Sequence, residues 1–136
     1  MNRKKAREYA FILLFEYKFQ PDEIERILSD FVAEYVPGDQ QEYIEKVVLG
    51  TIENLSEIDE KIGELSKGWK IERISSVSLS VMRLATYEIE FCDDIPGVVS
   101  VNEAVALAKK YEGEEAAPFV NGILGKLCKM KGAKHE

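Results

Sequence analysis

The amino-acid sequence predicts an all-α protein of six or seven helices. Apolar residues recur at the three- and four-residue spacings of a helix face along nearly the whole chain. Proline, glycine and capping residues divide this pattern into segments of ordinary helix length. No stretch shows the alternation of apolar and polar residues that a half-buried strand requires. The 136 residues, 46% of them hydrophobic, are enough for one domain with a sizeable core.

The N-terminal half is expected to form four helices. The first has an apolar face within residues 6–17, and the second follows Pro21 and ends at the Pro-Gly pair at positions 37–38. Asp39 and Glu42 have the spacing of a capping box for the third helix. Ser56 is expected to cap a fourth helix, whose apolar residues recur as far as Trp69.

The C-terminal half is expected to form the remaining helices. Residues 74–91 are apolar on more than one face, which is typical of a central, enclosed helix. Ser100 and Glu103 have capping-box spacing for the next helix, and Pro118 suits the first turn of the last one. Gly122 and Gly125 in that helix cost about 1 kcal/mol each relative to alanine, so we interpret them as positions of close helix contact.

Several function classes find no support in the sequence. The longest apolar runs are far shorter than the roughly 20 residues that cross a bilayer, and charges flank them, so we expect a cytoplasmic protein without a membrane segment. Cys92 and Cys128 lack metal-site spacing, and His135 has no residue nearby to orient it. No paired carboxylates, nucleophile with a histidine, or phosphate-binding glycine loop stands out. We therefore expect no catalytic activity, no metal and no cofactor.

The charge is unevenly distributed. The whole chain has a formal charge of −7, but residues 1–10 and residues 126–136 each carry +3, which leaves −13 for the rest. An acidic body repels nucleic acid at long range, so any contact with a polyanion must be local and sensitive to salt. Four cations at the start of the first helix also oppose its dipole, and a negatively charged ligand would explain that small cost. Solvated helix ends are the alternative interpretation.

Six stretches resemble the NusB family of bacterial transcription antitermination factors, in the expected order along most of the chain. They are RKKAREYAFILLF, ENLSEIDEKI, GWKIERI, VMRLATYEI, IPGVVSVNEAVALAKKY and FVNGILGKL. The resemblance implies two small helical bundles packed together as one domain, with an N-terminal group over about residues 1–67 and a C-terminal group over about residues 68–132. It further implies binding of single-stranded boxA leader RNA together with NusE, a small-subunit ribosomal protein, in an RNA polymerase complex that favours complete ribosomal RNA synthesis.

The resemblance also suggests site residues. On the RNA side these are Arg3, Lys4, Lys5, Arg7, Glu115 and Asn121. On the side of the NusE partner they are Phe15, Glu72, Ser78 and Phe119. The basic residues would hold phosphates, which positions RNA without reading its sequence, whereas exposed aromatic residues suit a protein interface.

Departures from the family pattern leave alternatives open. Ser78-Leu79 replaces a charged pair common in the family, Gly125 stands where aspartate is frequent, and lysines replace some N-terminal arginines. A helical adaptor without RNA function is one alternative. A separated substrate-binding module of a ribosomal RNA methyltransferase is another, although the chain has no room for a cofactor-binding α/β domain. A homodimer that buries the NusE surface is also compatible with the sequence.

Overall fold

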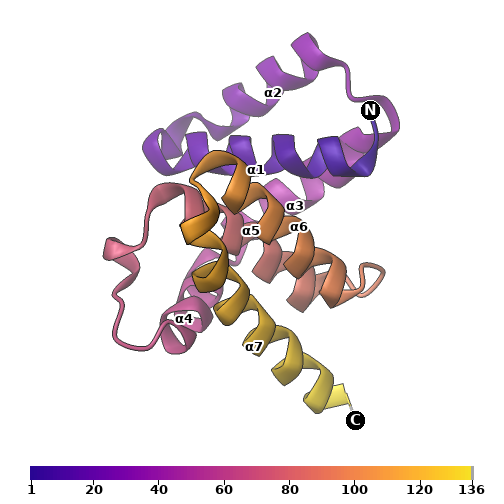
Figure 1. The fold of residues 1–136 in the computed structure, drawn as a ribbon. Coiled ribbons are helices and arrows are strands. Elements are labelled where there is room, and N and C mark those ends of the chain that lie inside the picture. The colour runs from indigo at the N-terminus through magenta and orange to yellow at the C-terminus, as the bar shows by residue number, and fades with distance from the viewer. Residues whose placement is uncertain (136) are drawn as a thin grey trace.

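A computed structural model describes residues 1–135, with side chains for residues 1–132. Within these residues the chain forms seven α-helices joined by short turns, and no strand (Figure 1). The all-α prediction is therefore confirmed. The helices are α1 (Arg3–Phe19), α2 (Ile24–Tyr35), α3 (Gln41–Glu53), α4 (Leu55–Leu65), α5 (Ser76–Phe91), α6 (Gly97–Tyr111) and α7 (Ala117–His135). Four 3-10 turns occur at Pro21–Glu23, Gly38–Gln40, Ile71–Arg73 and Glu114–Ala116. The side chain of His135 lies outside the described part.

The central helix is α5, as its apolar faces predicted. It packs against α1, α3, α4, α6 and α7, and 11 of its 16 residues are buried (Figure 1). One carboxylate, that of Glu88, lies among these buried residues. A buried carboxylate requires a cation or hydrogen-bond donors as partners, so side chains near Glu88 are expected to be engaged in contacts with it.

Helix α1 runs across the molecule below α2 in Figure 1 and packs on both α3 and α5. Ala6 and Ala10 are completely buried, and small side chains at these positions let α1 lie close to its neighbours. In Figure 1, α2 lies above α1 at the edge of the fold, whereas α6 and α7 pair in front of α5. This arrangement places the start of α1 beside α6.

Three predicted helix caps are wrong. Asp39 lies in the turn before α3, where Gln40 occupies the cap position, and Ser56 lies inside α4 because that helix begins directly after Asn54. α6 begins at Gly97, so Ser100 is inside the helix and buried. Its hydroxyl donates a hydrogen bond of 2.8 Å to Glu88. Capping-box spacing therefore locates a helix start only approximately, because the helix can begin a few residues before or after the predicted cap.

Two further interpretations need correction. α4 ends at Leu65, and left-handed backbone at Lys67 and Gly68 turns the chain so that Trp69 lies outside the helix, 56% exposed. A Cβ added at Gly122 or Gly125 would meet nothing within 4 Å, so these glycines do not serve a helix contact. Close approach occurs instead at Gly50 of α3, where a Cβ would collide with the ring of Tyr87.

Candidate nucleic-acid and partner interfaces

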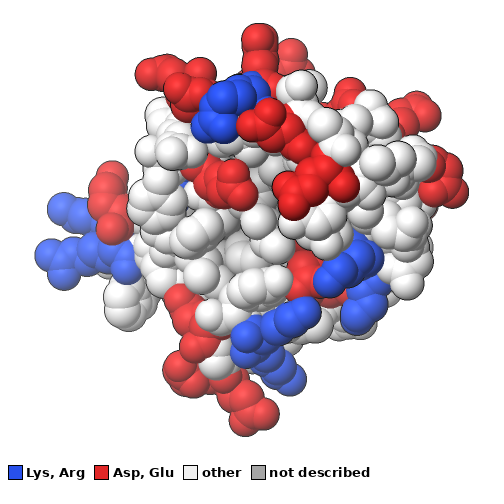
Figure 2. Space-filling view, turned by 90° about the horizontal axis from the view of Figure 1, so that it is seen from above, with Lys and Arg blue, Asp and Glu red and all other residues white. Residues whose placement is uncertain are grey.

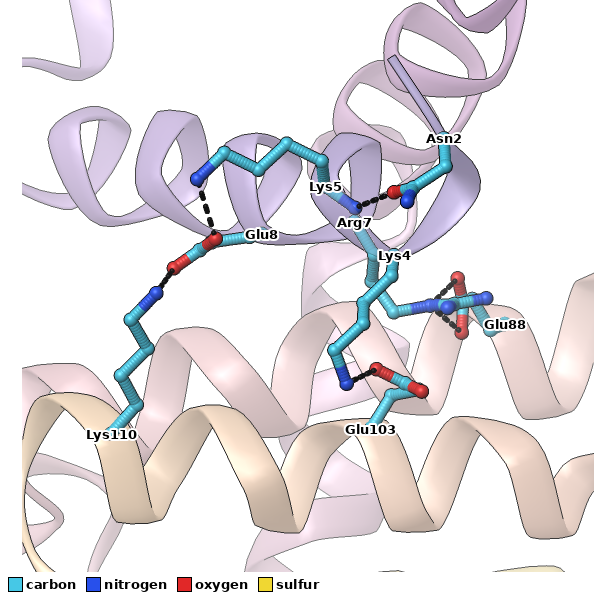
Figure 3. Close-up of polar contacts among 8 residues, drawn as sticks. All are labelled: Asn2, Lys4, Lys5, Arg7, Glu8, Glu88, Glu103 and Lys110. Atoms are coloured by element: carbon cyan, nitrogen blue, oxygen red, sulfur yellow. Dashed lines mark hydrogen bonds and ion pairs between the residues drawn. The ribbon is translucent and has the colours of Figure 1, made fainter.

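Three of the four N-terminal cations, Arg3, Lys4 and Lys5, are exposed on the first turn of α1. Figure 3 shows two of them, Lys4 and Lys5. The side chain of Asn2 caps this helix by accepting a hydrogen bond of 2.8 Å from the backbone N–H of Lys5. The guanidinium of Arg3 lies 4.0 Å from the centre of the Tyr43 ring and donates to Gln40 over 2.8 Å.

Each of the two exposed lysines has a carboxylate partner. Lys4 reaches Glu103 of α6 at 3.6 Å, and Lys5 reaches Glu8 on its own helix at 3.1 Å. Figure 2 shows the same pattern over one face of the molecule, where lysine and arginine side chains stand in separate groups beside acidic ones. The basic surface is thus a set of local clusters, which suits short-range contacts with a polyanion rather than long-range attraction.

Arg7 is placed differently from the prediction that it holds RNA phosphate. Its side chain is only 6% exposed, and its Nε donates to both carboxylate oxygens of Glu88 at 3.2 and 2.9 Å (Figure 3). The hydroxyls of Tyr43 and Ser100 also donate to Glu88. Burial and the neighbouring Glu88 carboxylate raise the pKa of the Tyr43 hydroxyl, which therefore keeps its proton. Arg7 is committed to an internal ion pair because Glu88 needs a buried cation.

Glu8 joins α1 to α6 and keeps its charge. Its Oε1 accepts from Lys5, and its Oε2 accepts from Lys110 at 2.6 Å and from the hydroxyl of Tyr111 at 2.5 Å. Burial by itself would raise the pKa of Glu8, but the hydrogen bonds from Lys110, Tyr111 and Lys5 together outweigh burial and lower that pKa to about 2. Lys110 was not among the residues predicted from sequence.

A second feature is a hollow of about 300 Å³ between α5, α7 and the turns that precede them, here called the Trp69 hollow. It brings together three of the predicted residues, Ser78, Glu115 and Phe119. The ring of Phe119 is partly exposed and meets the indole of Trp69 edge to face at 6.0 Å. The remaining lining residues are Trp69, Arg73, Ile74, Ser75, Glu112 and Ala116. The hollow therefore combines an aromatic wall with charges of both signs, a composition typical of protein interfaces.

Ser78 does not present its side chain to a partner as predicted. It is 3% exposed at the base of the Trp69 hollow, and its hydroxyl donates to Glu112 over 2.7 Å. The negative charge beside Ser78 in the hollow belongs to Glu112. The sequence did not indicate this contact, because Glu112 lies 34 residues further along the chain. Trp69 was also missed, since its spacing from the apolar residues of α4 assigned it to the core stripe.

The remaining predicted residues lie at separate positions on the surface. Glu72 is exposed in the turn Ile71–Arg73, and Asn121 is exposed on α7. Phe15 is only partly buried and packs between the rings of Phe11 and Phe19, with centroids 6.4 and 5.1 Å away. None of the α1 cations lines the Trp69 hollow, so the structure separates the basic cluster from the aromatic one.

The described residues contain no cluster of metal ligands, no disulfide and no membrane-spanning helix. Among the side chains of residues 1–132, no group of three or more histidine, cysteine, aspartate or glutamate residues could hold a metal ion. Cys92 is buried, and the half-buried Cys128 lies against Gly97, both as free thiols. None of the described helices is long and apolar enough to cross a membrane.

Comparisons with known proteins agree with this geometry. The model of the NusB family matches residues 4–129. A transcription antitermination protein NusB from Acetivibrio thermocellus is 46% identical over 132 residues, covering 96% of this chain and 91% of that protein. A solved structure of NusB from T. maritima has a TM-score of 0.88 at 38% identity and covers 95% of this chain and 92% of that one. A crystal structure described as antitermination factors NusB and NusE in complex with dsRNA has a TM-score of 0.85 at 29% identity, covering 94% and 96%.

Proposed function

The chain belongs to the NusB family of transcription antitermination proteins, and we propose that it promotes ribosomal RNA transcription by binding boxA-type leader RNA jointly with the ribosomal protein NusE. The observation that carries the RNA part is the group of exposed cations at the start of α1, in a chain whose total charge is −7. Family membership and the similarity to a NusB–NusE–RNA complex support the partner part.

In this proposal Arg3, Lys4 and Lys5 hold phosphates of the RNA. Lysine ammonium groups are compact point donors that keep free N–H bonds even when one donor is engaged, whereas the Arg3 guanidinium offers a planar fork. Asn121 is exposed on α7, and Glu115 is exposed where it lines the Trp69 hollow, so both would contact RNA bases beside the surface proposed below for NusE. The Asn121 amide both donates and accepts hydrogen bonds, and the Glu115 carboxylate accepts them, which suits base edges. Arg7 is left out of the RNA contacts because its charge is used inside the protein.

The Trp69 hollow is the proposed NusE surface. Phe119 and Trp69 supply the aromatic anchor, and Glu72 and Arg73 lie in the adjoining turn. Aromatic residues in a partly closed pocket are the usual centres of binding energy at protein interfaces. The protein then acts by binding alone, without catalysis or a cofactor, as one component of an antitermination complex on RNA polymerase in the cytoplasm.

The RNA part is tested by exchanging two lysines of α1. The double variant Lys4→Gln, Lys5→Gln is expected to bind a short boxA-like RNA more weakly at low salt. The slope of log K against log salt concentration should fall by about 0.7 for each phosphate that the variant no longer holds. Binding is measured by fluorescence anisotropy of labelled RNA at several salt concentrations.

The matched control is Lys18→Gln, because Lys18 is exposed on the last turn of the same helix. This variant should bind RNA with the affinity and the salt slope of the parent protein. A double variant at positions 4 and 5 that retains the parental slope would remove the start of α1 from the RNA interface.

A further inference from the structure

We propose that Lys5 and Lys110 form one phosphate-binding clamp that joins α1 to α6, with Glu8 holding the two ammonium groups in place. The inference deepens the proposed function and rests on it, because the ligand is a phosphate of the RNA backbone. It adds a residue of α6 to the phosphate contacts that the sequence pattern and the family resemblance assign to the start of α1.

The geometry of the clamp is set by a single carboxylate. Glu8 accepts from Lys5 at one oxygen, over 3.1 Å, and from Lys110 at the other, over 2.6 Å. Figure 3 shows the two lysines approaching Glu8 from α1 and from α6. The Tyr111 hydroxyl donates to the same oxygen as Lys110, and the Glu8 side chain is only 9% exposed. Two ammonium groups from distant parts of the sequence thus become neighbours.

The charge balance of this group favours an anion. An ordinary ion pair cancels its own charge, whereas two ammonium groups on one carboxylate leave a net positive charge. The pKa of Glu8, lowered to about 2, keeps the carboxylate ionised at neutral pH, so the arrangement does not depend on protonation. The side chains of Lys5 and Lys110 are 49% and 59% exposed, and each ammonium has three donors, of which Glu8 engages one. The remaining donors are available to phosphate oxygens.

The position of the clamp favours RNA over an isolated anion. Lys4 lies next to Lys5 in the chain and contacts Glu103, which is two helical turns before Lys110 on α6 (Figure 3). The cations along the line where α1 meets α6 therefore form a row on two facing helices. Such a row follows a nucleic-acid backbone, in which each phosphate is one contact.

The test compares Lys5→Gln, Lys110→Gln and the double variant, with Lys109→Gln as the control because Lys109 is an exposed lysine on the same turn of α6. Each single variant should weaken binding of a short boxA-like RNA several-fold. Since both lysines hold the same phosphate, the salt slope of the double variant should fall by no more than about 0.7 in total, and the effects should not be additive. Lys109→Gln should bind like the parent protein.

Each single lysine variant should melt close to the parent, because Glu8 keeps the other lysine and the Tyr111 hydroxyl as donors. The double variant should melt at a lower temperature, because the Glu8 side chain is only 9% exposed and keeps Tyr111 alone. Binding is therefore measured at a temperature at which circular dichroism shows every variant to be folded.

If Lys110→Gln keeps the parental affinity and salt slope while the parent binds RNA, the clamp is overturned and the proposed function stands. Additive effects with a total slope change of about 1.4 would also overturn it, because they indicate two separate phosphates. If the parent binds no RNA with or without NusE, the clamp and the proposed function both fail.

Discussion

Arg7→Met is expected to destabilise the protein by about 3–5 kcal/mol, the cost of leaving a buried carboxylate without its cation. Glu88 is completely buried, and Arg7 is its only cationic partner among the ion pairs of the described residues. Methionine retains much of the aliphatic bulk, so the variant isolates the removal of the charge. The melting temperature should fall by roughly 10 °C or more. Thermal unfolding followed by circular dichroism measures this change.

The matched control is Arg26→Met on α2. Arg26 forms exposed ion pairs with Glu23 and Asp30 at 2.7 and 3.1 Å, and such surface pairs contribute about 0–1 kcal/mol. Its melting temperature should lie close to that of the parent. Should Arg7→Met melt normally and instead reduce the salt slope of RNA binding, Arg7 would be an RNA contact, as its place in the N-terminal cation cluster predicted.

Phe119→Asp is expected to abolish most binding to NusE while the protein remains folded. The ring is partly exposed and forms one wall of the Trp69 hollow with the indole, so its replacement removes an anchor of the proposed interface. Truncating such an anchor costs about 2 kcal/mol or more, which corresponds to roughly a 30-fold decrease in affinity. Isothermal titration of purified NusE into each variant measures the change.

Phe91→Asp is the control for this experiment. Phe91 is another exposed phenylalanine, 40% accessible on α5, and it stacks on Tyr87 away from the residues that line the hollow. The Phe91→Asp variant should bind NusE with the affinity of the parent protein. A Phe119 variant that melts far below the parent, or that binds NusE as tightly as the parent does, would contradict the assignment. A Phe15 variant would distinguish core packing from NusE binding less clearly, since the Phe15 ring packs between two other phenylalanines.

The fold was predictable from the sequence where the helical spacing of apolar residues marks the buried face of a helix. The apolar face of α1 and the enclosed position of α5 both appear in the structure, because a helix that is apolar on several faces has to be surrounded by other helices. Helix boundaries were less predictable. Ser100 and Glu103 have the spacing of a capping box, yet α6 begins earlier, at Gly97 after Pro96. The hydroxyl of Ser100 donates a hydrogen bond to Glu88 instead.

The cation cluster of the candidate site was visible in the sequence, but the contacts of each cation were not. A cluster of cations in the sequence does not reveal which of them a buried carboxylate will claim, and the partner of Arg7 lies 81 residues away. A signal was nevertheless present, because Glu88 lies inside an otherwise apolar segment and a carboxylate in that position requires a buried partner. Lys110 gave no such signal, since its role depends on how α6 packs beside α1.

The most direct test of RNA binding aided by NusE is a titration of labelled single-stranded boxA-like RNA with the parent protein, with and without NusE, at two salt concentrations. Unlabelled scrambled RNA and duplex RNA serve as competitors. We predict binding that weakens with salt, tightens when NusE is present, and is displaced less well by the scrambled sequence than by boxA-like RNA. Tight binding to NusE with no effect on RNA affinity, and equal displacement by every competitor, would contradict this prediction and identify the chain as a protein adaptor.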